Sequence, residues 1–452
     1  MAPPESQSCI LVLGLPPSSL CGIDLLSFTP SPRFHGIKQV PAGWHFLFTG
    51  STTSLSIRHG EWLQIAPQST GSDAVATTES VPNDLDLHIR RWNPSTETLV
   101  DDQSPAQIQQ WRSRITTVWK EGLTPYRQSA TAGDGTANSA LSTEDTRDWH
   151  RLTEHITPSL LNRITDSHDD PIAPRDWRLT SASSASRDMD DIPGLSDSES
   201  ATRQLEEKEL AFLPIDLKQT WRAGAVGRER TEAAQDRSWA LGEVLGAQQT
   251  SSNDDTGEDG DGETALLGEM QLTFLMVLTL GNYSCLEQWK RILGLVFTCR
   301  AAVRERPGLF VRFLKLLFLQ LRHCGDVDGG LFDLSDEGGA LLRGLLKGFR
   351  RSLEDLAEIK TLTPSEPDKT EGTTKRMVRD VRDVRDQYQD LETYVRAEFG
   401  WELSDSYVRR GMLELEDGEQ VEMEVDDLEG EDERGDYAPV VVDLGDTDIT
   451  TP

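Results

Sequence analysis

Residues 266–297 read LLGEMQLTFLMVLTLGNYSCLEQWKRILGLVF, and this stretch decides the fold of the second half of the chain. Its first part, residues 266–281, is apolar nearly all round, a pattern typical of a helix buried on every side. A break follows at Gly281 and Asn282. Residues 283–297 then predict an amphipathic helix, because apolar residues recur every three or four positions. The repeating positions are Leu286, Trp289, Ile292, Leu293 and Val296.

Three more helices are predicted after this pair. Pro307 is favourable at a first helical position and precedes the apolar segment 309–321. Residues 341–356 place leucines and a phenylalanine on one face, and residues 377–395 alternate spacings of four and three. The last pattern resembles a coiled-coil seam, but it is shorter than three to four heptads, which favours a core-facing helix over a dimerisation helix. The sequence thus predicts an all-α domain over residues 265–403.

The first 127 residues have a different pattern, with short apolar or alternating runs separated by turn residues. Such runs predict β-strands, and Gly, Pro and Asn between them predict turns. His59 and Gly60 are read as one of these turns. The sequence predicts a sandwich-like all-β domain, residues 1–127, and therefore an α+β multidomain protein. The candidate strands are residues 10–13, 44–49, 54–58, 62–65 and 85–92.

Residues 128–264 predict a linker region with short helices and low-complexity loops. Three segments, 129–146, 181–200 and 248–263, are rich in Ser, Thr, Gly and Asp and have few large apolar residues. Between the first two, apolar residues recur at helical spacing around Pro158, which marks a helix start or a kink. These residues are Trp149, Leu152, Ile156, Leu160, Leu161 and Ile164.

The C-terminal residues predict a strand carried on a charged tether. Residues 414–433 hold twelve carboxylates and no basic residue, so we expect the segment 404–436 to be disordered. Residues 437–452 form a tail with a β-branched run that favours strand addition to the sheet edge of a partner. The predicted partner-binding residues are Val440, Val441, Val442, Asp443 and Leu444.

Charge and cysteine content restrict the class of protein. The chain has 452 residues, with 77 acidic against 45 basic side chains and a formal net charge of −32. This charge repels phosphate backbones, so we expect no direct nucleic-acid binding and favour basic protein surfaces as partners. The five cysteines form no close-spaced pair, which indicates a reduced intracellular protein. The N-terminus does not resemble a signal peptide, and no apolar stretch reaches the roughly 20 residues of a membrane span.

The sequence offers no motif for catalysis. None of the eight histidines stands in a HExxH arrangement, and no GxSxG or Walker-type motif is present. Gly257, Gly260 and Gly262 lie in an acidic segment that would repel phosphate, so we interpret them as linker. We therefore expect no enzyme activity, no cofactor and no metal. A hydrolase or nucleotide-dependent enzyme with a dispersed site stays open as an alternative, as does an acidic adaptor that binds through charge alone.

Two local features have competing interpretations. Ser251 and Ser252 precede several acidic residues, the setting that an acid-directed kinase prefers, so they are possible regulatory phosphorylation sites. A merely solvated loop is an equally good interpretation of this segment. Trp289 with Lys290 and Arg291 could form an exposed patch, but Trp289 shares an apolar helix face with its neighbours, which favours core packing.

Several blocks of the sequence resemble the A1-cistron splicing factor family, whose members are chaperones of U5 snRNP assembly. The N-terminal block joins GID at residues 22–24, PRFHGIK at 32–38 and VPAGWHF at 40–46. Further blocks are WALGEVL at 239–245, residues 268–295 and APVVVDL at 438–444, with FGWEL at 399–403 as a smaller match. The loops 129–146, 181–200 and 248–263 and the acidic stretch are longer than the family pattern.

This resemblance implies a β-rich N-terminal domain, a VHS-like helical C-terminal domain and a role without catalysis. It implies binding to the large U5 snRNP scaffold protein through its RNase H-like and MPN-like domains, with the tail added as a strand between them. It further implies that the bound chaperone keeps the U5 RNA helicase away until phosphorylation and nuclear entry release it. We accordingly expect a monomer that is both cytoplasmic and nuclear and acts in pre-mRNA splicing.

Overall fold

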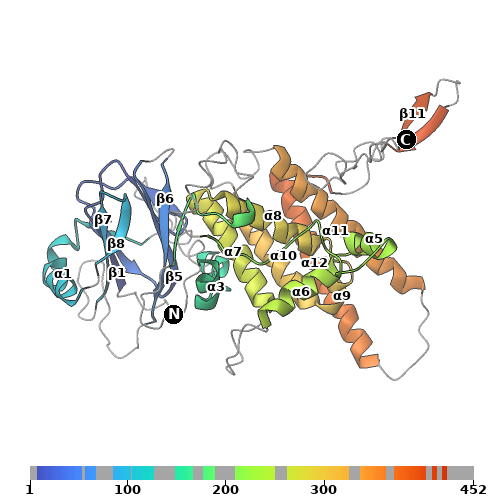
Figure 1. The fold of residues 1–452 in the computed structure, drawn as a ribbon, viewed down its shortest axis with the longest axis horizontal. Helices are drawn as coiled ribbons and strands as arrows, with labels where there is room; N and C mark the ends of the chain where they lie inside the picture. The colour runs from blue at the N-terminus through green and yellow to red at the C-terminus, as the bar shows by residue number, and fades with distance from the viewer. Residues whose placement is uncertain are drawn as a thin grey trace, which may run out of the picture.

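The computed structural model has two β-sheets at one end and a bundle of helices at the other (Figure 1). Most strands come early in the chain and most helices later, as the sequence predicted, although β10 follows α3 and two further strands come last. The structure describes residues 8–52, 56–67, 85–102, 104–126, 148–165, 177–188, 209–249, 262–324, 336–362, 371–403, 410–414 and 420–424.

The N-terminal part is a sandwich of two five-stranded sheets. The first sheet has the order β8-β7-β1-β4-β9, and β1 pairs parallel to β7 and antiparallel to β4. Its strands are β1 Ser8–Leu13, β4 Gly36–Val40, β7 Asp86–Asn93, β8 Thr98–Asp101 and β9 Leu123–Pro125. The second sheet, of order β10-β6-β5-β2-β3, contains β2 Leu20–Ile23, β3 Leu26–Phe28, β5 Gly43–Gly50, β6 Arg58–Ile65 and β10 Arg178–Thr180.

Both faces of the first sheet are buried, which explains why β1 reads as a continuous apolar run. Alternate residues of a strand point to opposite faces. Ile10 and Val12 belong to the core between the two sheets, whereas Leu11 packs in a separate cluster with Ile115 and Trp119. Those last two side chains come from helix α1 and its end, so a helix covers the outer face of the sheet.

Helix α1, Pro105–Val118, corrects the prediction that residues 1–127 are all β. Ser104 caps this helix by accepting a hydrogen bond from the backbone N–H of Gln107, and Pro105 occupies the favoured first position. Its exposed face is Gln-, Ser- and Thr-rich, whereas Ile108, Trp111, Ile115 and Val118 recur at helical spacing and pack on the sheet. The helical periodicity was therefore present in the sequence, and the prediction of an all-β domain overlooked it.

Strand β6 corrects a second prediction, because His59 and Gly60 lie inside it and form no turn. A Cβ atom at Gly60 would lie 2.2 Å from a ring carbon of Phe46 on the neighbouring strand β5. Glycine is therefore placed here to leave room for an aromatic ring, a use that glycine also has inside strands.

The outer face of the second sheet packs on the helices. Phe46 and Phe48 of β5 and Trp62 of β6 belong to the same hydrophobic cluster as the helical residues Leu266 and Trp289. One continuous core thus joins the sandwich to the helical part. A large apolar interface of this kind holds two domains in a fixed relation.

The region predicted as linker with short helices contributes to this core. The short helix at 148–152 and α3, Pro158–Ile164, bury Trp149, Leu152 and Leu161 against it. Pro158 begins α3, with Thr157 as the cap. The other described elements of the region are β10, the 3-10 helix η1 Ser186–Asp188, α5 Arg228–Gln235 and α6 Ser238–Gln249.

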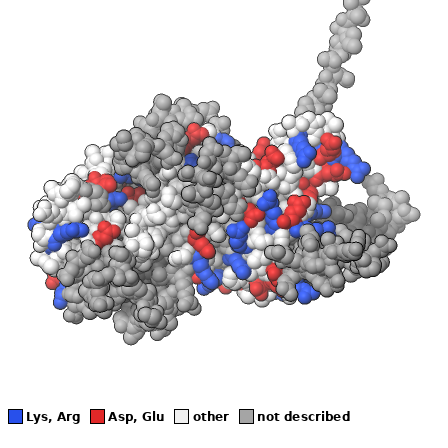
Figure 2. All heavy atoms as spheres, turned by 90° about the horizontal axis from the view of Figure 1, so that it is seen from below, with Lys and Arg blue, Asp and Glu red and all other residues white. Residues whose placement is uncertain are grey.

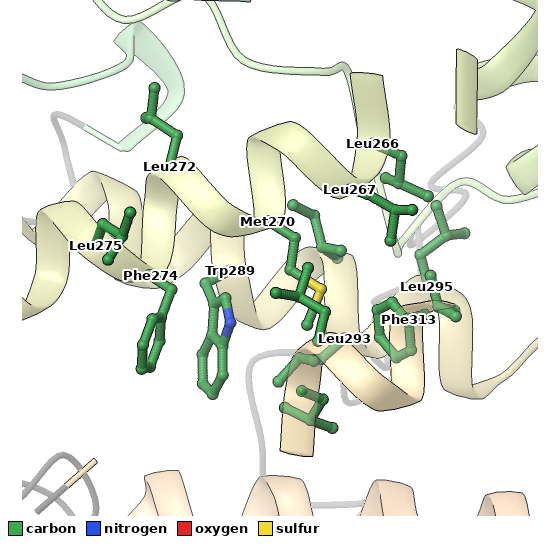
Figure 3. Close-up of a cluster of buried hydrophobic side chains, with 14 of the residues drawn as sticks. Leu266, Leu267, Met270, Leu272, Phe274, Leu275, Trp289, Leu293, Leu295 and Phe313 are labelled. Carbon is green, nitrogen blue, oxygen red and sulfur yellow. The ribbon is translucent and has the colours of Figure 1, made fainter. Parts of the chain in front are cut away.

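All five predicted C-terminal helices are present. The break between the first two is at Gly281, which has φ +68, and Asn282, whose side chain caps the second helix. Trp289 packs beside Phe274 and Met270 in the core (Figure 3), which confirms the prediction of core packing over an exposed patch. The helices are α7 Gly262–Leu280, α8 Tyr283–Phe297, α10 Pro307–Arg322, α11 Asp336–Leu362 and α12 Glu371–Phe399, with the short α9 Ala302–Glu305 between the second and third.

Helix α12 turns its seam toward the protein core. Val384, Tyr388, Leu391 and Val395 are buried in the main cluster, so the prediction of a core-facing helix is confirmed for these four residues. Helix α7 has the length and hydropathy of a membrane span, but 78% of that window is buried within the protein. This burial is the behaviour of the central helix of a packed bundle.

The segment 404–436, predicted to be disordered, contains a β-hairpin. Strands β11, Arg410–Glu414, and β12, Gln420–Glu424, pair antiparallel with Leu413 opposite Val421, and Figure 1 shows β11 projecting from the helical part. The sequence between them includes Asp417-Gly418, a dipeptide typical of hairpin turns. The prediction of disorder for residues 404–436 rested on acidic composition and did not use this turn signal.

Candidate functional site

The predicted site residues lie outside the part of the chain that the structure describes. These are the tail residues Val440, Val441, Val442, Asp443 and Leu444 and the possible phosphorylation sites Ser251 and Ser252. Their roles stay predictions. The described residues show instead how the two parts of the protein are joined, and therefore which surfaces are held in a fixed relation.

Four tryptophans form the centre of the junction between the sandwich and the helices. The ring centroids of Trp44 and Trp177 are 5.3 Å apart, and those of Trp62 and Trp149 are 6.2 Å apart. Trp149 also donates a hydrogen bond from Nε1 to the backbone oxygen of Trp44 at 2.7 Å. Aromatic pairs at these separations add stabilisation beyond the area that they bury.

Hydrogen bonds to backbone oxygens fasten the same junction. Arg58 of β6 donates from Nη1 to the carbonyl oxygen of Thr279 in α7 at 2.9 Å. Asn282 donates from Nδ2 to the carbonyl oxygens of Thr180 and Ser183 at 2.9 and 2.7 Å. The break between α7 and α8 is therefore tied to the sheet edge at β10.

A buried carboxylate, Glu269 of α7, organises the segment that connects the two parts. It accepts hydrogen bonds from Gln288 Nε2 at 2.6 Å, from Arg163 Nη2 at 2.7 Å and from the backbone N–H of Leu213 at 2.9 and 3.1 Å. The Glu269 side chain is fully buried. A buried charge is tolerated only when it is paired and hydrogen-bonded, and Glu269 meets both conditions.

A second charged group continues this network. Arg187 of η1 bonds Gln288 and the carbonyl oxygen of Ile215, and the neighbouring Asp188 pairs with Arg291 of α8. Burial, together with the nearby positive charge of Arg291, lowers the pKa of Arg187. Glu269, Arg187 and Arg291 thus hold the segment before α5, which includes Leu213 and Ile215, on helices α7 and α8.

Asp24 and His45 form a buried pair that resembles part of a catalytic triad. His45 Nδ1 lies 2.8 Å from Asp24 Oδ2, and Tyr126 donates to the same oxygen at 2.5 Å. In a hydrolase the other ring nitrogen would face a nucleophile, but His45 Nε2 lies 2.9 Å from the carbonyl oxygen of Pro41, which can only accept. Both side chains are almost fully buried. Because Asp24 also accepts from the backbone N–H of Phe46 at 2.8 Å, the pair locks the turn after β2 onto β5.

The described residues offer no candidate metal site, and the helical face in Figure 2 carries charges of both signs. Within the described ranges, no group of three or more His, Cys, Asp or Glu side chains is placed to hold a metal ion. On the face in Figure 2, the coloured acidic and basic side chains alternate over the helical part.

Sequence reasoning missed the junction, because its partners are far apart in the chain. Trp44 and Trp149 are separated by more than one hundred residues, and Glu269 and Arg163 likewise. The only signal was the presence of Glu269 and Gln288 on otherwise apolar helix faces. A charged residue in a buried helix indicates a buried partner.

These features define a class of protein: a β-sandwich and a helical bundle fused through one core, with a buried carboxylate, Glu269, that holds the connecting segment on the helices. Two family models match the chain, the AAR2 N-terminal domain over residues 6–166 and the AAR2 C-terminal repeat region over residues 212–404. The chain therefore belongs to the AAR2 family, the A1-cistron splicing factor family that the sequence blocks resemble.

Individual relatives agree with this family. The chain is 25% identical over 334 residues to the protein named Protein AAR2 homolog of Caenorhabditis elegans, covering 70% of this chain and 78% of the relative. It is 25% identical over 343 residues to Protein AAR2 homolog of Homo sapiens, covering 72% and 77% respectively. The similarity to the Mus musculus protein of the same name is 24% over 343 residues.

Proposed function

We propose that this chain is a non-catalytic splicing factor that acts as an assembly chaperone of the U5 snRNP. The observation that carries the proposal is the match of AAR2 family models to both parts of the chain. In this function the protein binds the large U5 scaffold protein through its RNase H-like and MPN-like domains. While bound, it blocks early binding of the U5 RNA helicase.

The fused core supports a chaperone that holds two partner domains at once. Because the sandwich and the helices share one hydrophobic cluster, a surface on each keeps a constant distance and orientation to the other. A preorganised body loses less conformational entropy on binding than two domains on a flexible linker. The tail from Val440 to Leu444 then adds one strand to the scaffold, with Val440, Val442 and Leu444 on one side.

Affinity purification of the tagged full chain from its native cell tests the role. We expect the scaffold protein to co-purify without the helicase. Recovery of the helicase in stoichiometric amounts with the scaffold would contradict the blocking role, and absence of the scaffold would contradict the proposal as a whole. Phosphorylation at Ser251 or Ser252 is expected in the free form of the protein, and mass spectrometry of both pools measures it.

Calorimetric titration with the scaffold domains tests the strand separately. Replacing Val440, Val442 and Leu444 by Ser is expected to weaken binding, because the side chains that give specificity are lost while the body stays folded. The matched control replaces Asp446, Thr447 and Asp448, which lie just beyond the strand. Equal affinities for the two variants would rule out strand addition.

A further inference from the structure

Residues 216–237 leave the core and return to it as a finger with a fixed base. At its end, Arg237 donates from Nη1 to Thr298 Oγ1 at 3.1 Å and from Nη2 to the carbonyl oxygen of Leu217 at 3.5 Å. The carboxylate of Asp236 accepts from the backbone N–H groups of Arg300 and Ala301 at 2.9 and 3.1 Å. The C-terminal end of the finger is therefore attached to residues 298–301 at the end of α8, and Arg237 ties the N-terminal end to it through Leu217.

The finger is also bonded within itself. Thr220 Oγ1 donates to the carbonyl oxygen of Ala233 at 2.9 Å, and Arg230 Nε donates to that of Ala225 at 2.5 Å. Gly224 and Gly227 adopt φ values of +86 and +50, which glycine adopts readily. This geometry presents Val226 at the tip with 68% of its surface exposed. A single exposed apolar residue is ordinary, so Val226 marks a binding site only if the residues around it support one.

The surroundings of Val226 lack the strong negative charge of the rest of the chain. Residues 216–237 contain five basic and four acidic residues, a local net charge of +1 in a chain of −32. The basic residues are Lys218, Arg222, Arg228, Arg230 and Arg237. Arg228 pairs with Glu232 at 2.6 Å, and Arg237 belongs to the fixed base, so Arg222 is the arginine near the tip that can meet a partner.

Two of these arginines pack on tryptophans. The guanidinium of Arg222 lies 5.7 Å from the ring centroid of Trp239, and that of Arg230 lies 5.4 Å from the centroid of Trp221. Within the described part of the chain, no hydrogen bond or ion pair involves the side chain of Arg222; its carbonyl oxygen accepts from the backbone N–H of Ala225 at 3.0 Å. A guanidinium that packs on an indole keeps its donors available for a carboxylate. Trp and Arg are among the residues enriched at interface hot spots.

We propose that residues 217–231 form a docking finger for an acidic segment of a partner protein. An apolar side chain of that segment packs on Val226, and a carboxylate of the segment binds Arg222. A protein is favoured over single-stranded RNA, because arginines already pack on the two tryptophans that bases would use for stacking. This surface is separate from scaffold binding through the tail, so either proposal can fail without the other.

Fluorescence anisotropy on the full chain tests the finger. The probe is a fluorescein-labelled peptide of nine residues, Asp and Glu around one central Leu, and the comparison peptide carries Ser in place of Leu. We expect the Leu peptide to bind more tightly, and Arg222→Glu to weaken it by roughly tenfold. Val226→Ser is expected to reduce the Leu peptide to the affinity of the Ser peptide.

Matched controls separate the finger from general effects. Arg33→Glu changes the charge equally at an exposed residue of the sandwich, and Ile57→Ser removes another exposed apolar side chain. Neither control is expected to change peptide affinity, and circular dichroism checks that each variant is folded. No peptide binding, equal binding by the chain and its Arg222→Glu variant, or equal affinities for the two peptides would overturn the proposal. Tighter binding of a nine-nucleotide oligouridine that Arg222→Glu abolishes would replace it with a nucleic-acid site.

Discussion

Replacing Glu269 by Gln tests the buried network that joins the two parts of the protein. The change keeps the size of the side chain but turns one carboxylate oxygen into an NH₂ group. The remaining oxygen still accepts from Leu213 and Gln288, so the loss falls on the 2.7 Å ion pair with Arg163. The new NH₂ group also faces the Arg163 donors, which leaves both groups unsatisfied.

The expected cost follows from burial on the two sides of the pair. Removing one partner of a fully buried pair destabilises by about 3–5 kcal/mol, and one charge-assisted hydrogen bond contributes about 1.5–3 kcal/mol. The Glu269 side chain is fully buried, but that of Arg163 is 24% exposed and can recover some hydration. We therefore expect a loss of about 2–4 kcal/mol in the free energy of unfolding.

Urea unfolding of the full chain, followed by tryptophan fluorescence and circular dichroism, measures this loss. Because one core joins both parts, we expect a single transition with an unchanged slope. Glu243→Gln, at an exposed position of α6, is the matched control and is expected to stay within about 0.5 kcal/mol. In the Arg163→Gln background, Glu269→Gln is expected to cost less. If the Glu269 and Glu243 variants unfold at the same midpoint, the network does not stabilise the junction and the reasoning fails.

Three further outcomes are expected. Gly268→Ala is expected to lower the free energy of unfolding by about 1–3 kcal/mol, since its Cβ would lie 2.3 Å from the carbonyl oxygen of His155. The Cβ of Gly242→Ala would meet nothing within 4 Å, so this variant is expected to raise the free energy of unfolding by about 0.5–1 kcal/mol. If urea unfolding finds the Gly268 variant more stable than the Gly242 variant, this packing is contradicted. Burial opposes ionisation of Asp236, but hydrogen bonds from Ser238 and from the N–H groups of Arg300 and Ala301 outweigh burial and lower the pKa of Asp236. The ionised Asp236 therefore stabilises the fold above a pH of about 4, and this stabilisation is lost below it. The difference in free energy of unfolding between the chain and Asp236→Asn should close as the pH falls from 6 to 3. A gap that widens on acidification would refute that assignment. All five thiols are buried, and burial raises the pKa of Cys21 to about 12. A thiolate-directed reagent at pH 8 is therefore expected to label none of the five cysteines until urea is added. Mass spectrometry measures the labelling.

Prediction succeeded where the signal was local and long. Residues 283–297 carry enough apolar positions at helical spacing to define α8 at both ends, and Asn282 supplies the cap. It overlooked α1, although Ile108, Ile115 and Val118 lie at helical spacing. It also failed where glycine had a packing role, as at Gly60. A long charged run hid the hairpin of β11 and β12, although Asp417 and Gly418 carried a turn signal.

The sequence by itself determined the helices of the second half, the β-rich character of the first, the charge and the family. These depend on side chains within a few residues of one another or on blocks read directly from the chain. Only the tertiary structure decided that both faces of the first sheet are covered, that Glu269 contacts Arg163 and Leu213, and that Val226 is exposed at the tip of the finger. These contacts join residues distant in the chain, so they form only when the whole fold closes around them. Residues 266–297 show both kinds of information. Their spacing predicts two helices, whereas two partners of the buried Glu269, Arg163 and Leu213, come from other parts of the chain. Only Gln288 lies within the same stretch.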